Sequence, residues 1–256
     1  MPLSPDPWSS FAVRFFWFRL DALIAVIGYL FGSIPFGLLV AKSRGVDIRQ
    51  HGSGNIGATN VMRTLGKGAG YTVFACDAFK GIFAVLVAKY IASRHVLALP
   101  LAGSNVRIRD ISGVEHVIHN IHYYSLPISV AAITAAVACI IGHNFPIWLG
   151  FKGGKGMATS AGVLIAMIPE TAMVCLALWA LIFLATRYVS LASICAAIAL
   201  PPVTVIFLVL GVIHGWPYFY FTLAAGLLAV IRHKSNIVRL MNGTENRFVK
   251  KPKENQ

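Results

Sequence analysis

Residues 142–156 read GHNFPIWLGFKGGKG, and this stretch ends one apolar segment and precedes the next. It closes on three glycines and a lysine, namely Gly153, Gly154, Lys155 and Gly156. Glycines let successive backbone N–H groups form a concave nest, and a lysine there supplies positive charge for a phosphate. A helix is predicted from Met157, and its N-terminus would face the same anion. The pattern predicts a phosphate loop; the alternative is a glycine-rich turn whose lysines only follow membrane topology.

The composition is that of a membrane protein. The 256 residues are 57% hydrophobic and only 12% charged, and the mean hydropathy is +0.72. Apolar runs of about 15–25 residues recur, which suits membrane helices, and they lack the period-two alternation of barrel strands. We predict an all-α, polytopic membrane bundle of about seven helices, the fourth of them short: 20–41, 70–91, 123–149, 157–169, 171–186, 190–213 and 217–231.

Three parts are predicted along the chain. Residues 1–19 are rich in proline and aromatic residues and predict an interfacial lead-in, and residues 20–240 form a single integral membrane domain. Within it, a polar loop on the outer side covers about 92–122. Residues 241–256 form a cytoplasmic tail. In the first span Pro35 predicts a kink, because proline removes a helical hydrogen bond.

The net charge of +13 has a topological pattern. Most of the 22 lysines and arginines follow the first, third, fifth and seventh spans. If the helices alternate in direction, these positions share one side, which the positive-inside rule places in the cytoplasm. The N-terminus is then outside and the C-terminus cytoplasmic. This pattern argues against a nucleic-acid-binding surface, and it gathers the glycine-rich motifs on the cytoplasmic face.

A second candidate anion site lies in residues 52–63, which read GSGNIGATNVMR. Its glycines free the backbone, and Arg63 offers a two-pronged fork for phosphate. Four side chains add hydrogen-bonding groups, namely Ser53, Asn55, Thr59 and Asn60. The alternative is a structural turn, but this density of polar groups around an arginine favours ligand binding.

Ionisable residues inside the spans need partners. Asp77 and Lys80 lie three residues apart on one helical face and predict a structural ion pair. Ser190, after the fifth span, either caps the sixth helix or faces the site. Three histidines recur in the outer loop without a complete set of zinc ligands, so no metal is predicted there: His116, His119 and His122.

The last span ends in a basic segment that carries a third polar cluster. His233 and Asn236 are neighbours on one helical face, and Arg232 and Arg239 share a face with Asn236. A basic helix end commonly meets lipid headgroups. Together with the two glycine loops it indicates two anion sites at one membrane face. That arrangement suits acyl-phosphate or phosphoryl chemistry, an anion transporter or, more weakly, a scaffold that binds lipid headgroups.

A resemblance decides among these classes. The ordered motifs GSIPFG, GSGNIGATNVMRTLGK, GHNFPIWLGFKGGKGMAT, RYVSLAS, RHKSNI and GTENRF resemble those of the acyl-phosphate:glycerol-3-phosphate acyltransferase family (PlsY type) of bacterial membranes. The resemblance implies a seven-helix enzyme of the bacterial plasma membrane with its site facing the cytoplasm. It implies acyl transfer from acyl phosphate to the 1-hydroxyl of glycerol 3-phosphate, without a metal, coenzyme or obligatory protein partner.

Site roles follow from these motifs and from residue chemistry. Catalytic roles are expected for Ser53, Arg63, Lys155 and His233. Substrate binding is expected for Asn55, Thr59, Asn60, His143, Gly153, Gly154, Gly156, Ser190 and Asn236. The proton acceptor stays open between His233 and a substrate phosphate. A transporter would place its site near the midplane, often with inverted repeats, and no such repeat is evident.

Overall fold

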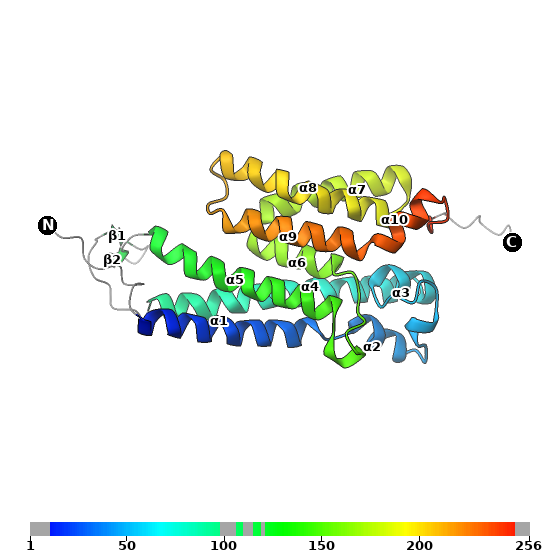
Figure 1. Cartoon of the computed structure of the whole chain (residues 1–256), viewed down its shortest axis with the longest axis horizontal. Coiled ribbons are helices and arrows are strands. Elements are labelled where there is room, and N and C mark those ends of the chain that lie inside the picture. The colour runs from blue at the N-terminus through cyan, green and yellow to red at the C-terminus, as the bar shows by residue number, and fades with distance from the viewer. Residues whose placement is uncertain (1–10, 98–105, 110–114, 119–120, 249–256) are drawn as a thin grey trace.

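The computed structural model describes residues 11–97, 106–109, 115–118 and 121–248. It is an elongated bundle of helices that lie roughly along one axis (Figure 1). Its apolar helices are α1 (Phe11–Gly32), α4 (Lys67–Leu97), α5 (Ile121–Asn144), α6 (Met157–Met167), α7 (Pro169–Thr186), α8 (Val189–Val209) and α9 (Pro217–Arg232).

In the described part of the chain, five segments are long and apolar enough to cross a membrane: Phe16–Lys42, Lys67–His95, Pro127–Leu149, Pro169–Thr186 and Val189–Val209. Two further apolar helices, α6 and α9, are shorter. The prediction of a short fourth span is confirmed by α6. The predicted seventh span is also short, because α9 begins at Pro217 and ends at Arg232.

Short elements gather at the end of the bundle where the polar motifs lie. They are α2 (Phe36–Lys42), η2 (Ile48–Gln50), α3 (Ala58–Leu65), η3 (Ile147–Leu149) and α10 (Lys234–Met241). The opposite end carries two short strands, β1 (Val106–Arg109) and β2 (Glu115–Ile118), which pair antiparallel. The all-α prediction therefore needs a correction in the outer loop, where β-branched residues and arginines form a small hairpin.

The first predicted span is longer at its start and broken near its end. Helix α1 begins at Phe11, so part of the predicted lead-in 1–19 is helical; residues 1–10 lie outside the described part. The break at Pro35 confirms the predicted kink, with α1 ending at Gly32 and α2 starting at Phe36. One carbonyl freed at the break, that of Ile34, accepts a hydrogen bond from Lys80 Nζ at 3.1 Å.

Close helix contacts hold α6 against α4. A Cβ atom placed on Gly81 of α4 would overlap the carbonyl oxygen of Thr159 in the first turn of α6. Small residues at such contacts let helix backbones approach, which is how membrane helices associate where lipid is as apolar as their side chains. The first turn of α6, which follows the GGKG sequence, is therefore anchored on α4.

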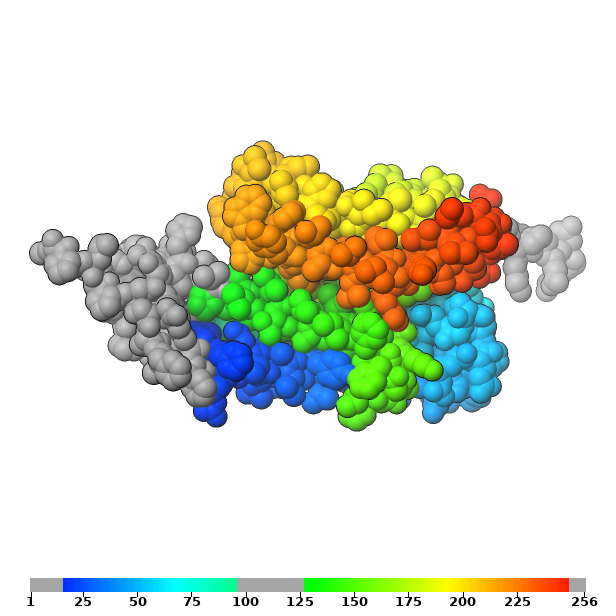
Figure 2. All heavy atoms as spheres, viewed as in Figure 1, coloured from blue at the N-terminus to red at the C-terminus, as the bar shows by residue number. Residues whose placement is uncertain are grey.

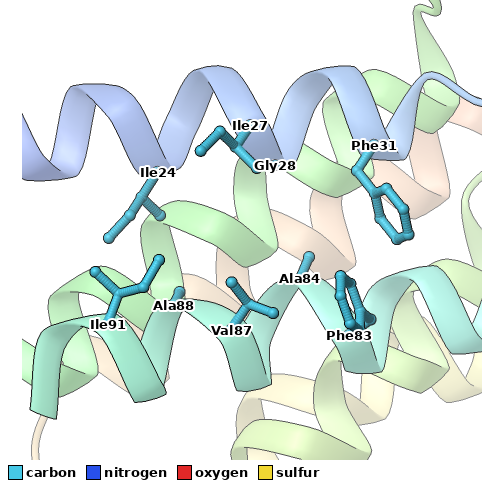
Figure 3. A pocket seen from close by; sticks show the side chains of 9 residues that line it. All are labelled: Ile24, Ile27, Gly28, Phe31, Phe83, Ala84, Val87, Ala88 and Ile91. Atoms are coloured by element: carbon cyan, nitrogen blue, oxygen red, sulfur yellow. The ribbon is translucent and has the colours of Figure 1, made fainter. Parts of the chain in front are cut away.

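An apolar pocket lies between α1 and α4 (Figure 3). Its walls carry only hydrocarbon and glycine: Ile24, Ile27, Gly28, Phe31, Phe83, Ala84, Val87, Ala88 and Ile91. A phosphate needs hydrogen-bond donors or cations, so this pocket is not the anion site, which we locate from the polar groups instead.

Candidate active site

Three segments that are distant in sequence meet at one end of the bundle. They are the loop before α3, the loop 153–156 before α6, called the glycine loop below, and the segment after α9 (Figure 1). In Figure 2 the C-terminal segment, in red, lies next to the cyan segment that contains α3. Arg63 Nη2 donates to the carbonyl oxygen of Asn246 at 2.9 Å, which ties these two segments together.

The glycine loop differs from the predicted nest, because not all of its backbone N–H groups are available to bind a ligand. Gly153 N–H donates to the Asn144 carbonyl at 3.2 Å, and Gly154 N–H donates to the His143 carbonyl at 3.1 Å. Both donors are therefore used inside the protein. No hydrogen-bond partner within the described residues meets the N–H groups of Lys155, Gly156 and Met157. These groups lie at the start of α6, where an anion also meets the positive end of the helix dipole.

Arg232 holds the same loop from its carbonyl side. Its Nη2 donates to the carbonyl oxygens of Gly154 at 2.6 Å, Gly153 at 3.2 Å and Asn144 at 3.3 Å. Its guanidinium also lies over the Phe145 ring, 4.9 Å from the centroid. The sequence placed Arg232 only on a basic helix face. Its role as a clamp was missed, because the three carbonyls lie some eighty residues earlier in the chain.

Lys155 lies at the centre of the cationic cluster. Its Nζ donates to Asn236 Oδ1, which confirms that the glycine loop meets the last helix. Burial lowers the pKa of Lys155 to about 8, and the nearby guanidinium groups of Arg239, Arg232 and Arg63 act in the same direction. Positive charges are thus concentrated at a partly buried position, which is typical of sites that bind anions.

Glu245 is the carboxylate of this cluster, and the sequence analysis missed it. It accepts hydrogen bonds from Ser190 Oγ at 3.0 Å, Asn236 Nδ2 at 2.9 Å and Arg239 Nε at 2.8 Å. Burial alone would raise the pKa of Glu245. The hydrogen bonds from Asn236, Arg239 and Ser190 together outweigh this effect and lower the pKa. A sequence clue existed, because Glu245 is the only acidic residue between positions 171 and 253.

These contacts exclude one of the two roles considered for Ser190 and show where the first part of the predicted tail lies. Ser190 does not cap α8: the cap position is Tyr188, with no side-chain hydrogen bond, and the Ser190 hydroxyl binds Glu245 instead. The predicted tail 241–256 is not separate from the bundle as far as residue 248. Phe248 N–H donates to the Arg187 carbonyl at 3.0 Å, so this part of the tail completes the site.

His233 is buried and neutral at physiological pH. Burial lowers the pKa of His233 to about 4, and Lys155 contributes in the same direction. Its Nδ1 lies 2.8 Å from the carbonyl oxygen of Ala229. Because a carbonyl only accepts, Nδ1 carries the proton and Nε2 presents a lone pair. His233 is therefore a hydrogen-bond acceptor, suited to a substrate hydroxyl.

The loop before α3 uses part of its predicted binding set internally. Asn60 Nδ2 donates to the carbonyls of Asn55 at 2.9 Å and His51 at 3.0 Å, and its Oδ1 accepts from Ser53 N–H at 3.0 Å. Asn55 Oδ1 accepts from Gly57 N–H at 2.8 Å. The amide of Asn60 therefore shapes this loop, and the predicted contact of Asn60 with substrate stays a prediction.

Other predicted site residues remain available in this region. Within the described residues the hydroxyls of Ser53 and Thr59 make no hydrogen bond, and Ser53 is exposed. Arg63 is exposed as a whole residue, but its guanidinium is partly covered by Phe248, whose ring centroid lies 4.7 Å away. Desolvation lowers the pKa of Arg63, but an arginine stays charged at any physiological pH.

The ion pair predicted for Asp77 and Lys80 is confirmed, with 2.8 Å between Asp77 Oδ1 and Lys80 Nζ. His143 joins this pair, which the sequence did not indicate. The structure brings together no group of three or more metal-ligating side chains in the described ranges. His119 of the outer loop lies outside them.

The apolar helical bundle defines a membrane protein, and the cationic cluster at one end of it has a charge that suits anions. A family model described as "Glycerol-3-phosphate acyltransferase" matches residues 22–243. The chain belongs to this family and is a membrane acyltransferase, as its motifs indicated.

Individual relatives agree along nearly the whole chain. A protein named Glycerol-3-phosphate acyltransferase from Thermosynechococcus vestitus is 40% identical over 227 residues, covering 88% of this chain and 94% of that protein. A protein of the same name from Geobacter sulfurreducens is 38% identical, covering 89% and 97%.

Two solved structures share the fold. One is described as PlsY (YgiH), an integral membrane glycerol 3-phosphate acyltransferase in its glycerol 3-phosphate form. It is 36% identical, with a TM-score of 0.69 over 90% of this chain and 96% of that chain. The lysophosphatidic acid form of the same protein is 35% identical, with a TM-score of 0.67 over 90% and 95%.

Proposed function

We propose that the protein transfers a fatty acyl group from an acyl phosphate to the 1-hydroxyl of glycerol 3-phosphate. The hydroxyl oxygen attacks the acyl carbonyl carbon, the bond from that carbon to the phosphate oxygen breaks, and the hydroxyl proton passes to a base. The products are lysophosphatidic acid and inorganic phosphate. Because the acyl group is already activated, catalysis consists of bringing two anions together and stabilising the charge that develops on oxygen.

The excess of positive charge around Lys155 carries this proposal. Arg63, Arg232 and Arg239 act on its pKa, against a single carboxylate, Glu245. The excess positive charge of such a cluster is neutralised by a bound anion. The open N–H groups at the start of α6 supply directional hydrogen bonds to a phosphate at the same place.

Each substrate is assigned to one side of the cluster. The glycine loop with Lys155, His143, Gly153, Gly154 and Gly156 holds the phosphate of the acyl donor. Glycerol 3-phosphate lies toward the other two segments, whose contributing side chains are Ser53, Asn55, Thr59, Arg63, Ser190, His233 and Asn236. Asn60 shapes the loop that presents this set.

His233 orients the attacking hydroxyl in this scheme. Its Nε2 lone pair accepts the hydroxyl hydrogen bond, because Nδ1 is used by the Ala229 carbonyl. With a pKa of about 4, the imidazole is a weaker base than a phosphate monoester dianion, whose second pKa is about 6. The proton therefore passes to a substrate phosphate, and His233 contributes binding and alignment.

We expect His233→Ala to raise the KM for glycerol 3-phosphate roughly tenfold, the scale of one lost hydrogen bond, with a smaller fall in kcat. The measurement is initial rate against glycerol 3-phosphate at saturating acyl phosphate. A large fall in kcat at unchanged KM would instead make His233 the general base.

We also propose the membrane arrangement. Seven helices cross the bacterial plasma membrane, with the N-terminus outside and the C-terminus and the site on the cytoplasmic side. The basic residues that follow alternate spans support this orientation. It also gives the site direct access to water-soluble glycerol 3-phosphate.

The test of the proposed function is a coupled product measurement. The purified protein in detergent, without added metal or coenzyme A, receives palmitoyl phosphate and glycerol 3-phosphate. Equal amounts of phosphate and lysophosphatidic acid are expected. If a folded, lipid-supplemented preparation makes product only from an acyl thioester, the acyl-phosphate donor is wrong. If it makes none but moves phosphorylated solutes across liposomes, the protein is a transporter.

The pH dependence of the reaction follows from Lys155. Its pKa of about 8 predicts that kcat/KM falls as pH rises above about 8, because the neutral amine no longer attracts phosphate. A bound anion raises that pKa, so kcat should fall only at higher pH. The effect of Lys155 on folding stability has the opposite sign to its effect on the rate. The unfolded chain keeps the lysine proton up to about pH 10.4. Between about pH 8 and 10.4 the unfolded state therefore binds more protons than the folded state, and the free energy of unfolding rises with pH.

A pH profile of kcat/KM with a parallel thermal-unfolding series checks this prediction. The falling rate above pH 8 should occur without loss of folded protein, and Lys155→Met should lack this alkaline limb. A Lys155→Met enzyme with an unchanged profile would assign the titration to another group.

A further inference from the structure

A buried ionic cluster lies directly beneath the glycine loop, and the proposed reaction uses only one of its members. Lys80 is 0% exposed, Asp77 2% and His143 5%. Charges buried this deeply are costly unless each has a partner. The cluster joins α4, which carries Asp77 and Lys80, to the end of α5, which carries His143.

Lys80 contacts two hydrogen-bond acceptors and forms an ion pair with Asp77. Its Nζ lies 2.8 Å from Asp77 Oδ1, 2.9 Å from His143 Nδ1 and 3.1 Å from the Ile34 carbonyl. A lysine ammonium has three donors and no acceptor. The ammonium of Lys80 thus uses one donor on the Ile34 carbonyl and one on His143 Nδ1, which acts as an acceptor, while Asp77 offsets its charge.

This contact selects the tautomer of His143. A proton on Nδ1 would point at a donor 2.9 Å away, whereas the contact from Nδ1 to Asp77 Oδ1 is longer, at 3.4 Å. Because the contact from Nδ1 to Lys80 is the shorter of the two, Nδ1 accepts a hydrogen bond and carries no proton. The neutral ring then carries its proton on Nε2. His143 is then a donor at Nε2, the opposite of His233, whose Nδ1 binds a carbonyl.

The Nε2 atom of His143 lies against the glycine loop. A Cβ atom on Gly154 would overlap this nitrogen, so only glycine fits there. The loop itself is tied back to α5, because Gly154 N–H donates to the His143 carbonyl at 3.1 Å. The ring and the loop thus form one unit, with the Nε2 proton directed to the side on which Gly154 lies.

We propose that Asp77 and Lys80 are positioning residues, which hold His143 as a neutral Nε2–H donor to the phosphate of the acyl donor. The proposal rests on the proposed function, in which the glycine loop holds that phosphate. Lys80 fixes the tautomer, and Asp77 holds Lys80 in place through their ion pair. A neutral donor adds a directional hydrogen bond without adding charge beside Arg232 and Lys155.

The test is a double-mutant cycle between Lys80→Met and His143→Gln. A glutamine amide reaches the Nε2 position with its own N–H, so it needs no lysine to fix a tautomer. In the native background Lys80→Met should raise the KM for palmitoyl phosphate about ten- to a hundredfold, the scale of a hydrogen bond to a charged group. The KM for glycerol 3-phosphate should change little. In the His143→Gln background, Lys80→Met should have little further effect.

Two further variants keep this test decisive. Asp77→Leu with Lys80→Met leaves no unpaired ion, and it should show the same KM change if Lys80→Met alone does not fold. Lys89→Met is the matched control, because Lys89 is another lysine within α4 and, among the described residues, donates only to the Ala166 carbonyl at 2.7 Å. Its kinetics should equal those of the native enzyme.

Failure of this inference is distinct from failure of the proposed function. Additive effects of Lys80→Met and His143→Gln, or equal KM changes for both substrates, would show that Lys80 is merely structural. A native enzyme that makes no product from palmitoyl phosphate would instead remove the proposed donor and, with it, the partner assigned to His143.

Discussion

Replacing Lys155 by methionine should lower kcat about 10²–10³-fold, the scale of losing one charge-stabilising donor in a protected site. The methionine keeps the length and the apolar stem but removes the charge that faces the leaving phosphate. Lys155 is held by Asn236 Oδ1 and lies among guanidinium groups that lower its pKa. No other lysine of the glycine loop has this setting, because Lys152 is exposed.

Lys152→Met is therefore the matched control for Lys155→Met. It changes the net charge of the same loop by the same amount, so it reports any general effect of charge on substrate attraction. Both variants are compared by kcat and by KM for each substrate, with thermal unfolding to show that they fold. Near-native turnover by a folded Lys155→Met enzyme would remove Lys155 from the catalytic set.

Much of the fold was predictable because its causes are local. Long apolar runs require helices in a membrane, Pro35 breaks the first span, and Asp77 and Lys80 pair because they share a helical face. The segments that meet at the site were predictable, since two loops each combine glycines with a basic residue, Arg63 in one and Lys155 in the other. The resemblance of the ordered motifs then gave the family.

The finer contacts were not predictable, because a sequence pattern does not show which polar groups the folded chain pairs with one another. Asn60 looked like a ligand group, but the tertiary structure uses its amide to close its own loop. Gly153 and Gly154 looked like open donors, but the end of α5 supplies their acceptors. Glu245 looked like part of a tail, and its role depends on a turn after α10 that returns it to Ser190. A sequence pattern gives residue chemistry, and only packing decides which groups stay free.

Arg232→Met is predicted to lower kcat/KM by about a hundredfold, although Arg232 is not assigned to either substrate. Its Nη2 donates to three carbonyls of the glycine loop and the preceding helix end. Holding those carbonyls away from the ligand keeps the N–H groups at the start of α6 pointing toward it. Loss of the clamp lets the loop shift, and a displacement of about 1 Å costs on the order of 10²-fold in a positioning enzyme.

The matched control for Arg232→Met is Arg247→Met. Arg247 also donates to a backbone carbonyl, that of Thr186 at 3.1 Å, and its guanidinium lies 5.8 Å from the Tyr188 ring centroid. It has the same kinds of contact but holds no part of the glycine loop, so its loss should lower turnover far less than the loss of Arg232. Steady-state kinetics with both substrates, and the rate of cleavage of the loop by protease, separate the two variants. Equal turnover and equal cleavage rates for the two variants would mean that the glycine loop keeps its shape without Arg232. The contacts of the loop with α5 and α6 would then be sufficient to hold it.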